Sequence, residues 1–144
     1  MTLNTCSEII SLARELEEIS ARFYEDLSQR SDRDKDFLLS LVKENIKNIV
    51  AFERAYYGVI SDAIEGCFAF SLNPDEYRFD TQLAADVSYA DALTRAVEIE
   101  EKMARFYTDA AAQSKSLMAD LPRAFTLIAR KRNDRITRIK SLVA

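Results

Sequence analysis

Two glutamates hold matching positions in a segment that occurs twice along the chain. Residues 13–31 read ARELEEISARFYEDLSQRS and residues 96–114 read AVEIEEKMARFYTDAAAQS, and ten of the nineteen positions are identical. Glu17 and Glu100 each lie among apolar residues at helical spacing, seven positions before a tyrosine. In the core of a helical bundle, such inward carboxylates are ligands that hold paired metal ions. The repeat predicts a duplicated helical hairpin whose glutamates face a shared interior.

The residue types that usually complete such a metal site are missing. The chain has no histidine, which removes the commonest metal ligand and a common general base. Cys6 and Cys67 stand alone in the sequence, so we expect two reduced thiols, with a disulfide between them as the alternative.

Length and composition favour one domain over residues 1–144. Apolar residues make up 48% of the chain and charged residues 31%, which is a typical globular balance. A chain of 144 residues is long enough to bury a substantial core. Two glycines and two prolines leave few residues suited to tight turns, so we expect an all-α fold of long helices.

Charge and hydropathy argue against nucleic acid and membrane as partners. The net charge of −4 gives no basic surface for nucleic acid and no strong attraction to anionic lipid. No apolar run approaches the roughly 18 residues of a membrane span. The first ten residues lack the basic and apolar parts of a signal peptide, so we expect a cytoplasmic protein.

The first helical hairpin is expected over residues 5–66. Thr5 followed by Glu8 is a capping box, so the first helix should begin there and run to about Arg30. Glu17 falls inside the apolar stripe of this helix, and we therefore expect its side chain to point inward.

The second helix is expected over residues 33–65, with Gly66 at its end. Gly58 marks either a kink or an earlier end. Glu44 and Lys47 are polar positions on or next to the apolar face of this helix.

Residues 67–87 join the two hairpins and break the helical pattern. They include the turn signal Asn73-Pro74-Asp75, and their length of about 20 residues is unusual for a compact domain. A crossover that runs along a bundle and joins two parallel helices has this length. Its aromatic residues are too apolar for a free loop and should cover either the bundle or a partner subunit. They are Phe68, Phe70, Tyr77 and Phe79.

The second hairpin is expected over residues 88–143. Ser88 caps the third helix, which carries the second copy of the repeat. Asp120 begins the fourth helix, with a proline in its first turn. Helical spacing then places Arg132 and Arg135 on the apolar face of the fourth helix.

The whole pattern resembles the rubrerythrin-like branch of the ferritin-like family, from about Ser7 to Leu142. The resemblance rests on Glu17 and Glu100 with the Phe-Tyr pairs that follow them, and on the phase of the second and fourth helices. It implies a four-helix bundle of two hairpins, joined by a long crossover, around a di-iron or di-manganese centre. The positions that it assigns to metal ligands are Glu17, Glu44, Lys47, Glu100, Arg132 and Arg135.

The resemblance also assigns a role to the tyrosines of the repeat. It implies that the hydroxyls of Tyr24 and Tyr107 are hydrogen-bonded to the inner carboxylates. The alternative is that both tyrosines are simple core aromatics.

Three of the six implied ligand positions are cationic, which departs from the family pattern. Arginine stays protonated and offers no lone pair to a metal, and lysine would first have to lose its proton. Glu17, Glu44 and Glu100 contribute −3, whereas Lys47, Arg132 and Arg135 contribute +3. We therefore predict a buried ion-pair network in place of the metals, because the planar guanidinium suits carboxylate pairing. The alternatives are surface glutamates, and cationic side chains that extend their charged ends into water.

These observations lead to two main hypotheses about function. The first is a non-catalytic structural or interaction module without cofactor, forming a homodimer through a long helix face or the crossover aromatics. The second is a rubrerythrin-type di-iron or di-manganese oxidoreductase or peroxidase, or an iron-binding protein, with an atypical carboxylate site. Iron storage in a shell is a third possibility, but the chain lacks obvious ferroxidase ligands.

Overall fold

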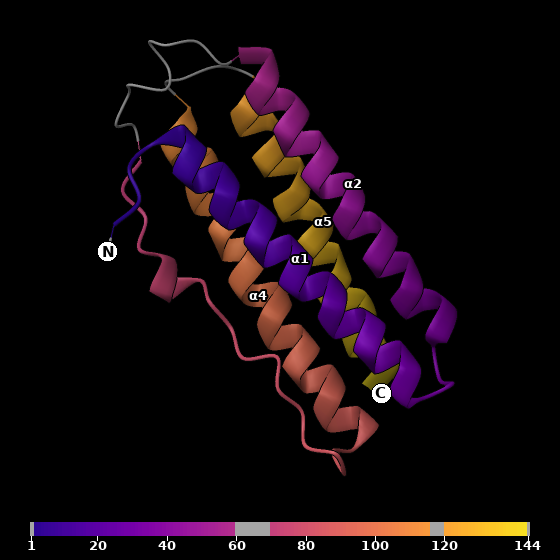
Figure 1. Cartoon of the computed structure of the whole chain (residues 1–144). Coiled ribbons are helices and arrows are strands. Elements are labelled where there is room, and N and C mark those ends of the chain that lie inside the picture. The colour runs from indigo at the N-terminus through magenta and orange to yellow at the C-terminus, as the bar shows by residue number, and fades with distance from the viewer. Residues whose placement is uncertain (1, 60–69, 116–119, 144) are drawn as a thin grey trace.

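The computed structural model describes residues 2–59, 70–115 and 120–143. These residues form four α-helices and one short 3-10 helix, without any strand, so the expected all-α fold is confirmed for them (Figure 1). None of these helices combines the length and the apolar character that a membrane crossing requires. The elements are α1 (Cys6–Arg30), α2 (Lys35–Val59), η1 (Pro74–Glu76), α4 (Tyr89–Ser114) and α5 (Asp120–Val143).

The start of α1 follows from the capping box. The backbone N–H of Glu8 donates to Thr5 Oγ1 at 3.2 Å, and the backbone N–H of Thr5 donates to Glu8 Oε1 at 3.1 Å. Each side chain thus satisfies a backbone donor that the first turn leaves unpaired. The predicted limits of the first helix are confirmed, since it begins directly after Thr5 and ends at Arg30.

The turn between α1 and α2 depends on Asp34. This residue has a φ of 57°, which is the left-handed region that aspartate tolerates better than most residues. Helix α2 therefore begins at Lys35, two residues later than predicted, and it continues through Gly58 to Val59. The predicted end of this helix, with Gly66, lies outside the described residues.

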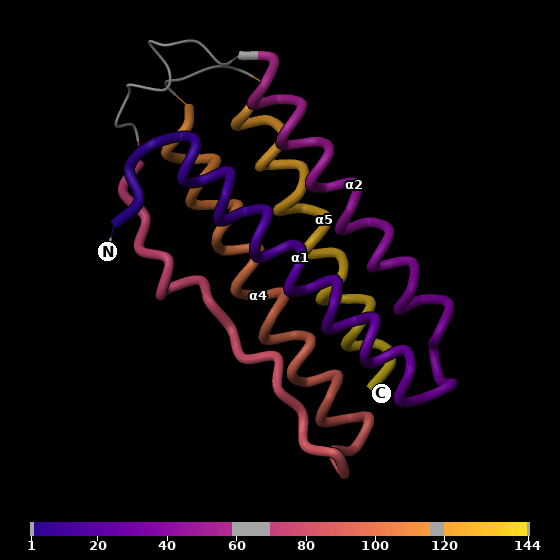
Figure 2. The backbone as a smooth tube through the Cα atoms, in the orientation of Figure 1, coloured from indigo at the N-terminus to yellow at the C-terminus, as the bar shows by residue number. Residues whose placement is uncertain are grey.

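Four long helices pack in two antiparallel pairs, α1 with α2 and α4 with α5 (Figures 1 and 2). The pairs meet where α1 contacts α4 and α2 contacts α5. Both α2 and α4 begin at the same end of the bundle, so they run in the same direction, whereas α1 and α4 run in opposite directions (Figure 1).

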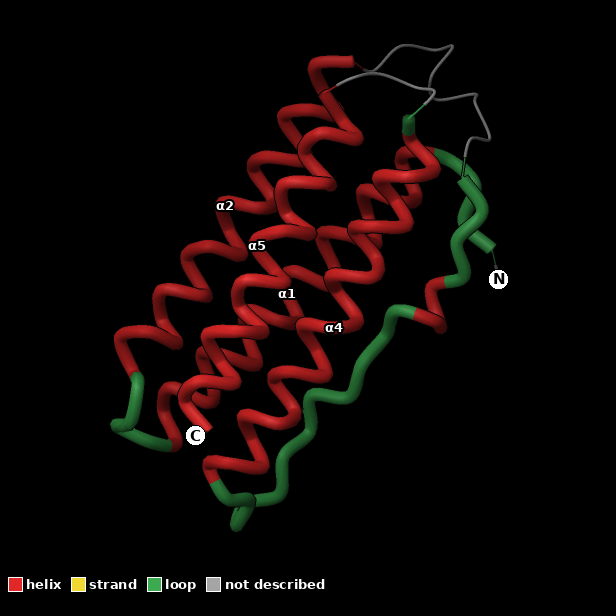
Figure 3. Tube along the Cα trace, turned by 180° about the vertical axis from the view of Figure 1, so that it is seen from behind, coloured by secondary structure: helices red, strands yellow, loops and turns green. Residues whose placement is uncertain are grey.

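Residues 70–88 run beside α4 along most of its length (Figure 3). An isolated antiparallel bridge between Leu3 and Leu72 ties this segment to the start of the chain. Phe70 and Tyr77 are each only 2% exposed, and Phe79 is half-buried against the core. These three aromatic residues therefore cover the side of their own bundle. Phe68 and Cys67 lie outside the described residues.

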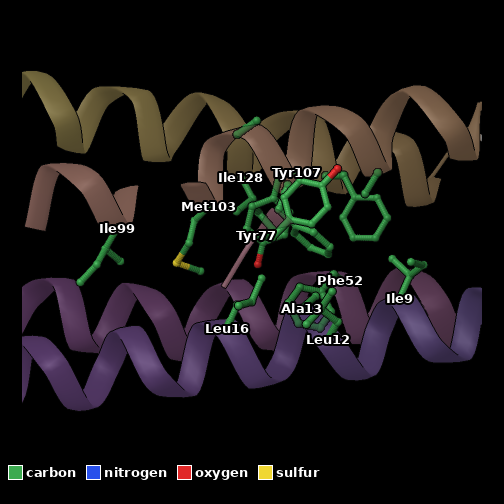
Figure 4. Packing of buried hydrophobic residues seen from close by; sticks show 14 of the residues in the cluster. Ile9, Leu12, Ala13, Leu16, Phe52, Tyr77, Ile99, Met103, Tyr107 and Ile128 are labelled. Atoms are coloured by element: carbon green, nitrogen blue, oxygen red, sulfur yellow. The ribbon is translucent and has the colours of Figure 1, made fainter. Parts of the chain in front are cut away.

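The core is continuous through the bundle and is rich in aromatic rings. In Figure 4, apolar side chains of α1, among them Ala13 and Leu16, face Tyr107 and Met103 of α4. Rings of three helices also meet, because the centroid of Phe52 lies 6.5 Å from that of Tyr107, and Phe125 lies 6.0 Å from Tyr107. Aromatic contacts of this kind add to the free energy of apolar burial and hold the helices at a fixed spacing.

Candidate functional site

The two glutamates of the repeat meet at the centre of the bundle. Glu17 on α1 and Glu100 on α4 are both fully buried. Because α1 and α4 are antiparallel, each tyrosine of the repeat reaches the glutamate of the other copy. Tyr107 Oη donates to Glu17 Oε1 at 2.8 Å, and Tyr24 Oη donates to Glu100 Oε2 at 2.6 Å. The two copies of the repeat are thus joined by reciprocal hydrogen bonds.

The guanidinium of Arg132 lies between the two carboxylates. Its Nη1 donates to Glu100 Oε1 at 2.9 Å and to Oε2 at 2.7 Å, while Nη2 donates to Glu17 Oε2. All three side chains are completely shielded from solvent. One arginine of α5 therefore joins α1 and α4 through charge-assisted hydrogen bonds, which are the stronger class.

Arg135 extends the cluster toward the edge of the bundle. Its Nε donates to Glu44 Oε1 at 3.0 Å, and its Nη2 donates to the backbone carbonyl of Leu41 at 3.2 Å. Its Nη1 lies 3.5 Å from Glu100 Oε2, and its Cζ lies 5.9 Å from the ring centroid of Tyr24. Arg135 is fully buried, but the side chain of Glu44 is 27% exposed, so the network reaches solvent at Glu44.

The prediction that Lys47 points into the bundle is wrong. Lys47 is exposed and forms no ion pair with any residue in the described part of the chain, whereas Asn45 and Asn48 are fully buried. The inward pair of α2 is therefore Asn45-x-x-Asn48, one position later than the predicted pair of Glu44 and Lys47. In α5 the predicted inward positions are confirmed, because Arg132 and Arg135 are both buried.

Three uncharged polar residues complete the cluster. Asn48 Nδ2 donates to Glu17 Oε1 at 3.2 Å, and Asn45 Nδ2 donates to Ser20 Oγ at 3.1 Å. Asn45 Oδ1 accepts from Arg132 Nη2 at 3.3 Å. The role of Asn45 was not predicted, although two asparagines three residues apart on an apolar helical face are a signal that could have revealed it.

The four fully buried charges cancel. Glu17 and Glu100 contribute −2, and Arg132 and Arg135 contribute +2. Glu44 adds one negative charge at the partly exposed edge. The predicted balance of three against three is therefore wrong, because Lys47 stays outside. A neutral buried set avoids the large cost of an unpaired ion in an apolar interior.

Burial and pairing shift the pKa values of the cluster. Burial raises the pKa of Glu17, against the opposing charges of Arg132 and Arg135. Burial lowers the pKa of Arg132, but the carboxylates of Glu100 and Glu17 outweigh it and the net shift is upward, so the guanidinium stays charged. Burial, followed by the neighbouring carboxylates, raises the pKa values of Tyr24 and Tyr107 well above the usual range. Both hydroxyls remain protonated donors at neutral pH.

Comparison of the chain with known protein families, with curated proteins and with solved structures gives no match. The chemistry of the site must therefore be judged from its own residues.

These residues do not suit a pair of metal ions. Within residues 2–59, 70–115 and 120–143 there is no group of three or more histidine, cysteine, aspartate or glutamate side chains that could hold a metal. The oxygens of Glu17 and Glu100 that would face a metal accept hydrogen bonds from Arg132. A guanidinium has no lone pair for a metal and repels a cation.

Replacing Arg132 tests the central ion pairs. We expect Arg132→Met to lower the free energy of unfolding by about 3–5 kcal/mol, because Glu17 then loses its arginine and Glu100 keeps only the longer contact with Arg135. Urea unfolding at neutral pH measures the change. Arg130→Met, at an exposed position of the same helix, is the matched control and should change stability by less than about 0.5 kcal/mol. A loss in Arg132→Met no larger than in this control would contradict the buried pairing.

The tyrosines predict a loss of stability at alkaline pH. Their pKa values are raised in the folded chain, so the unfolded chain releases these protons first when the pH rises above about 10. Stability is therefore fully present below pH 10 and falls above it. Each buried tyrosine steepens the fall by about 1.4 kcal/mol per pH unit. Urea unfolding between pH 9 and pH 11 should show a shallower fall for Tyr107→Phe, while Tyr57→Phe, at a position 65% exposed, should behave as the parent chain.

Proposed function

We propose that this chain is a non-catalytic, ferritin-like structural or interaction module in which a buried Glu–Arg network takes the place of two metal ions. The contact of Arg132 with both Glu17 and Glu100 is the observation on which the proposal rests. In ferritin-like di-metal proteins, inward carboxylates and histidines of four helices surround the ions. Here the corresponding places are held by two glutamates, two asparagines and two arginines.

The charge of the cluster supports this proposal. Four carboxylates balance two divalent ions in a di-metal bundle, and that balance requires the ions. In this chain, Arg132 and Arg135 supply the two positive charges as permanent parts of α5. The interior is then neutral without a cofactor, and each carboxylate already has hydrogen-bond donors.

Metal analysis is the direct test. We expect no stoichiometric iron or manganese in the protein purified after growth in medium rich in both metals. The measurement is elemental analysis by mass spectrometry, with the protein concentration from amino-acid analysis. About two bound ions per chain would contradict the proposal and favour the rubrerythrin-type oxidoreductase instead.

A designed variant tests the same proposal by a gain of metal binding. We expect Asn45→Glu, Asn48→His, Arg132→Glu and Arg135→His together to create a metal site with Glu17 and Glu100. Visible absorption of bound cobalt(II) would report it. The matched control carries Lys47→His in place of Asn48→His and should bind more weakly, because position 47 is exposed. Equal binding by the two variants would contradict the proposed correspondence.

A second copy of this chain is the partner that we propose for the module. The outer side of α2 exposes Ile46, Val50 and Tyr57, at 56%, 47% and 65% respectively, and Leu39 is half-buried on the same side. The spacing of these four residues is seven, four and seven, which reads the same in both directions. Two antiparallel α2 helices would therefore set Ile46 opposite Val50, as an interface with twofold symmetry requires.

Sedimentation equilibrium tests the dimer. We expect twice the chain mass for the parent protein and a single chain mass for Ile46→Glu, because a charge at the centre of an apolar contact disfavours association. Leu127→Glu, at a position 48% exposed on α5, is the matched control and should remain dimeric. A parent protein that sediments as a monomer, or an Ile46→Glu dimer, would contradict this interface.

A further inference from the structure

The repeat carries a second matched set of residues on the sides of α1 and α4 that face the segment of residues 70–88. In each copy an arginine and a phenylalanine precede the inward tyrosine, and an aspartate follows it by two positions. The phenylalanine and tyrosine rings meet edge-on in both copies, with centroids 5.4 Å apart at 80° in α1 and 5.2 Å apart at 70° in α4. The two sets are Arg22, Phe23 and Asp26 in α1, and Arg105, Phe106 and Asp109 in α4.

In α4 this set binds the side chain of Tyr77, which comes from the segment beside the helix. The ring of Tyr77 meets Phe106 edge-on, with centroids 5.4 Å apart at 75°. The Cζ of Arg105 lies 5.7 Å from the centroid of the Tyr77 ring. Tyr77 Oη donates to Asp109 Oδ2 at 2.6 Å. The three residues therefore form a binding site for a 4-hydroxyphenyl group, through edge-to-face, cation–π and charge-assisted contacts.

In α1 the same three residue types line a surface pocket of about 380 Å³. Phe79 and Leu83, from the segment that supplies Tyr77, form the opposite wall. Arg30 holds this wall in place, since its Nη1 donates to the backbone carbonyl of Ala84 at 2.9 Å. A pocket of this size can hold a small aromatic molecule.

Two charged residues of the α1 pocket have no partner within the described part of the chain. The side chains of Arg22 and Asp26 are exposed and form no hydrogen bond or ion pair with other residues in the described part of the chain. In the α4 site, by contrast, Arg105 lies 3.8 Å from Glu76 and 3.9 Å from Asp109. In the α1 copy, Arg22 and Asp26 therefore have no side chain of this chain bound to them, whereas the ring of Phe23 is only 4% exposed at the pocket.

We propose that the α1 pocket binds a 4-hydroxyphenyl group. Its ring lies against Phe23 and beneath the guanidinium of Arg22, and its hydroxyl donates to the carboxylate of Asp26. The arrangement is the one that Tyr77 shows in the other half of the molecule. A free phenol and the tyrosine side chain of another protein both present this group.

Titration of the labelled protein with p-cresol, followed by nuclear magnetic resonance, tests this site. We expect saturable millimolar binding, with chemical-shift changes at Phe23 and along residues 79–83. The analogue 4-methylanisole has no hydroxyl donor and should bind about tenfold more weakly. Absence of saturation, or equal affinity for the two compounds, would overturn the proposal.

Variants then assign the binding to the named residues. We expect Asp26→Ala to weaken p-cresol binding about tenfold, and Arg22→Ala to weaken it about threefold. Both positions are exposed, so circular dichroism should show unchanged helix content. Glu25→Ala, at the neighbouring exposed position outside the pocket, is the matched control and should bind as the parent does. An Asp26→Ala variant with parental affinity would place the site elsewhere.

A further titration distinguishes the two sources of the group. N-acetyltyrosinamide carries the same ring with a peptide backbone around it. Tighter binding of this compound than of p-cresol would identify a tyrosine of a protein partner as the ligand, and weaker or equal binding would identify a free phenol. Failure of both compounds to bind would refute this proposal but would not contradict the proposed metal-free Glu–Arg network.

Discussion

Two carboxylates can remain at the centre of an apolar bundle only if an equally buried group cancels their charge. Glu17 and Glu100 have no contact with bulk water, and their mutual repulsion is strong in a medium of low dielectric constant. Arg132 bridges the two carboxylates, because its planar guanidinium donates to both at once, and the buried Arg135 supplies the second positive charge. Helices α1, α4 and α5 must therefore each place one charged residue at the same level along the bundle axis. This requirement restricts the axial position of each helix relative to the other two.

The two hairpins match in one pair of helices and differ in the other. Helices α1 and α4 contribute the same residues, whereas α5 contributes two arginines and α2 contributes two asparagines. Charge explains the difference. Arginines on both α2 and α5 would place four positive charges against the two buried carboxylates, and an uncompensated excess of charge is costly in an apolar interior. The amides of Asn45 and Asn48 supply hydrogen bonds instead, without adding charge.

Much of this arrangement could be predicted from local sequence signals, and the errors have a physical cause. The capping box at Thr5 defined the start of α1, and the helical phase of α5 identified Arg132 and Arg135 as inward residues. The predicted pair of α2, Glu44 and Lys47, keeps the phase of Phe37. Leu38 is the fully buried residue at that turn, and one residue turns a helix by 100°. A shift of one residue is hard to detect in an amphipathic helix when the positions on either side of its apolar face are also partly apolar. The crossed bonding of the tyrosines depends on how α1 and α4 pack, which no local pattern specifies.

The crossed hydrogen bonds make each half of the chain depend on the other. Each half brings a carboxylate whose phenolic donor belongs to the opposite half. Either hairpin alone would leave its glutamate and its tyrosine hydroxyl without these partners, so each half completes its interior only against the other half. Because both halves belong to one chain, this pairing is intramolecular and does not depend on protein concentration.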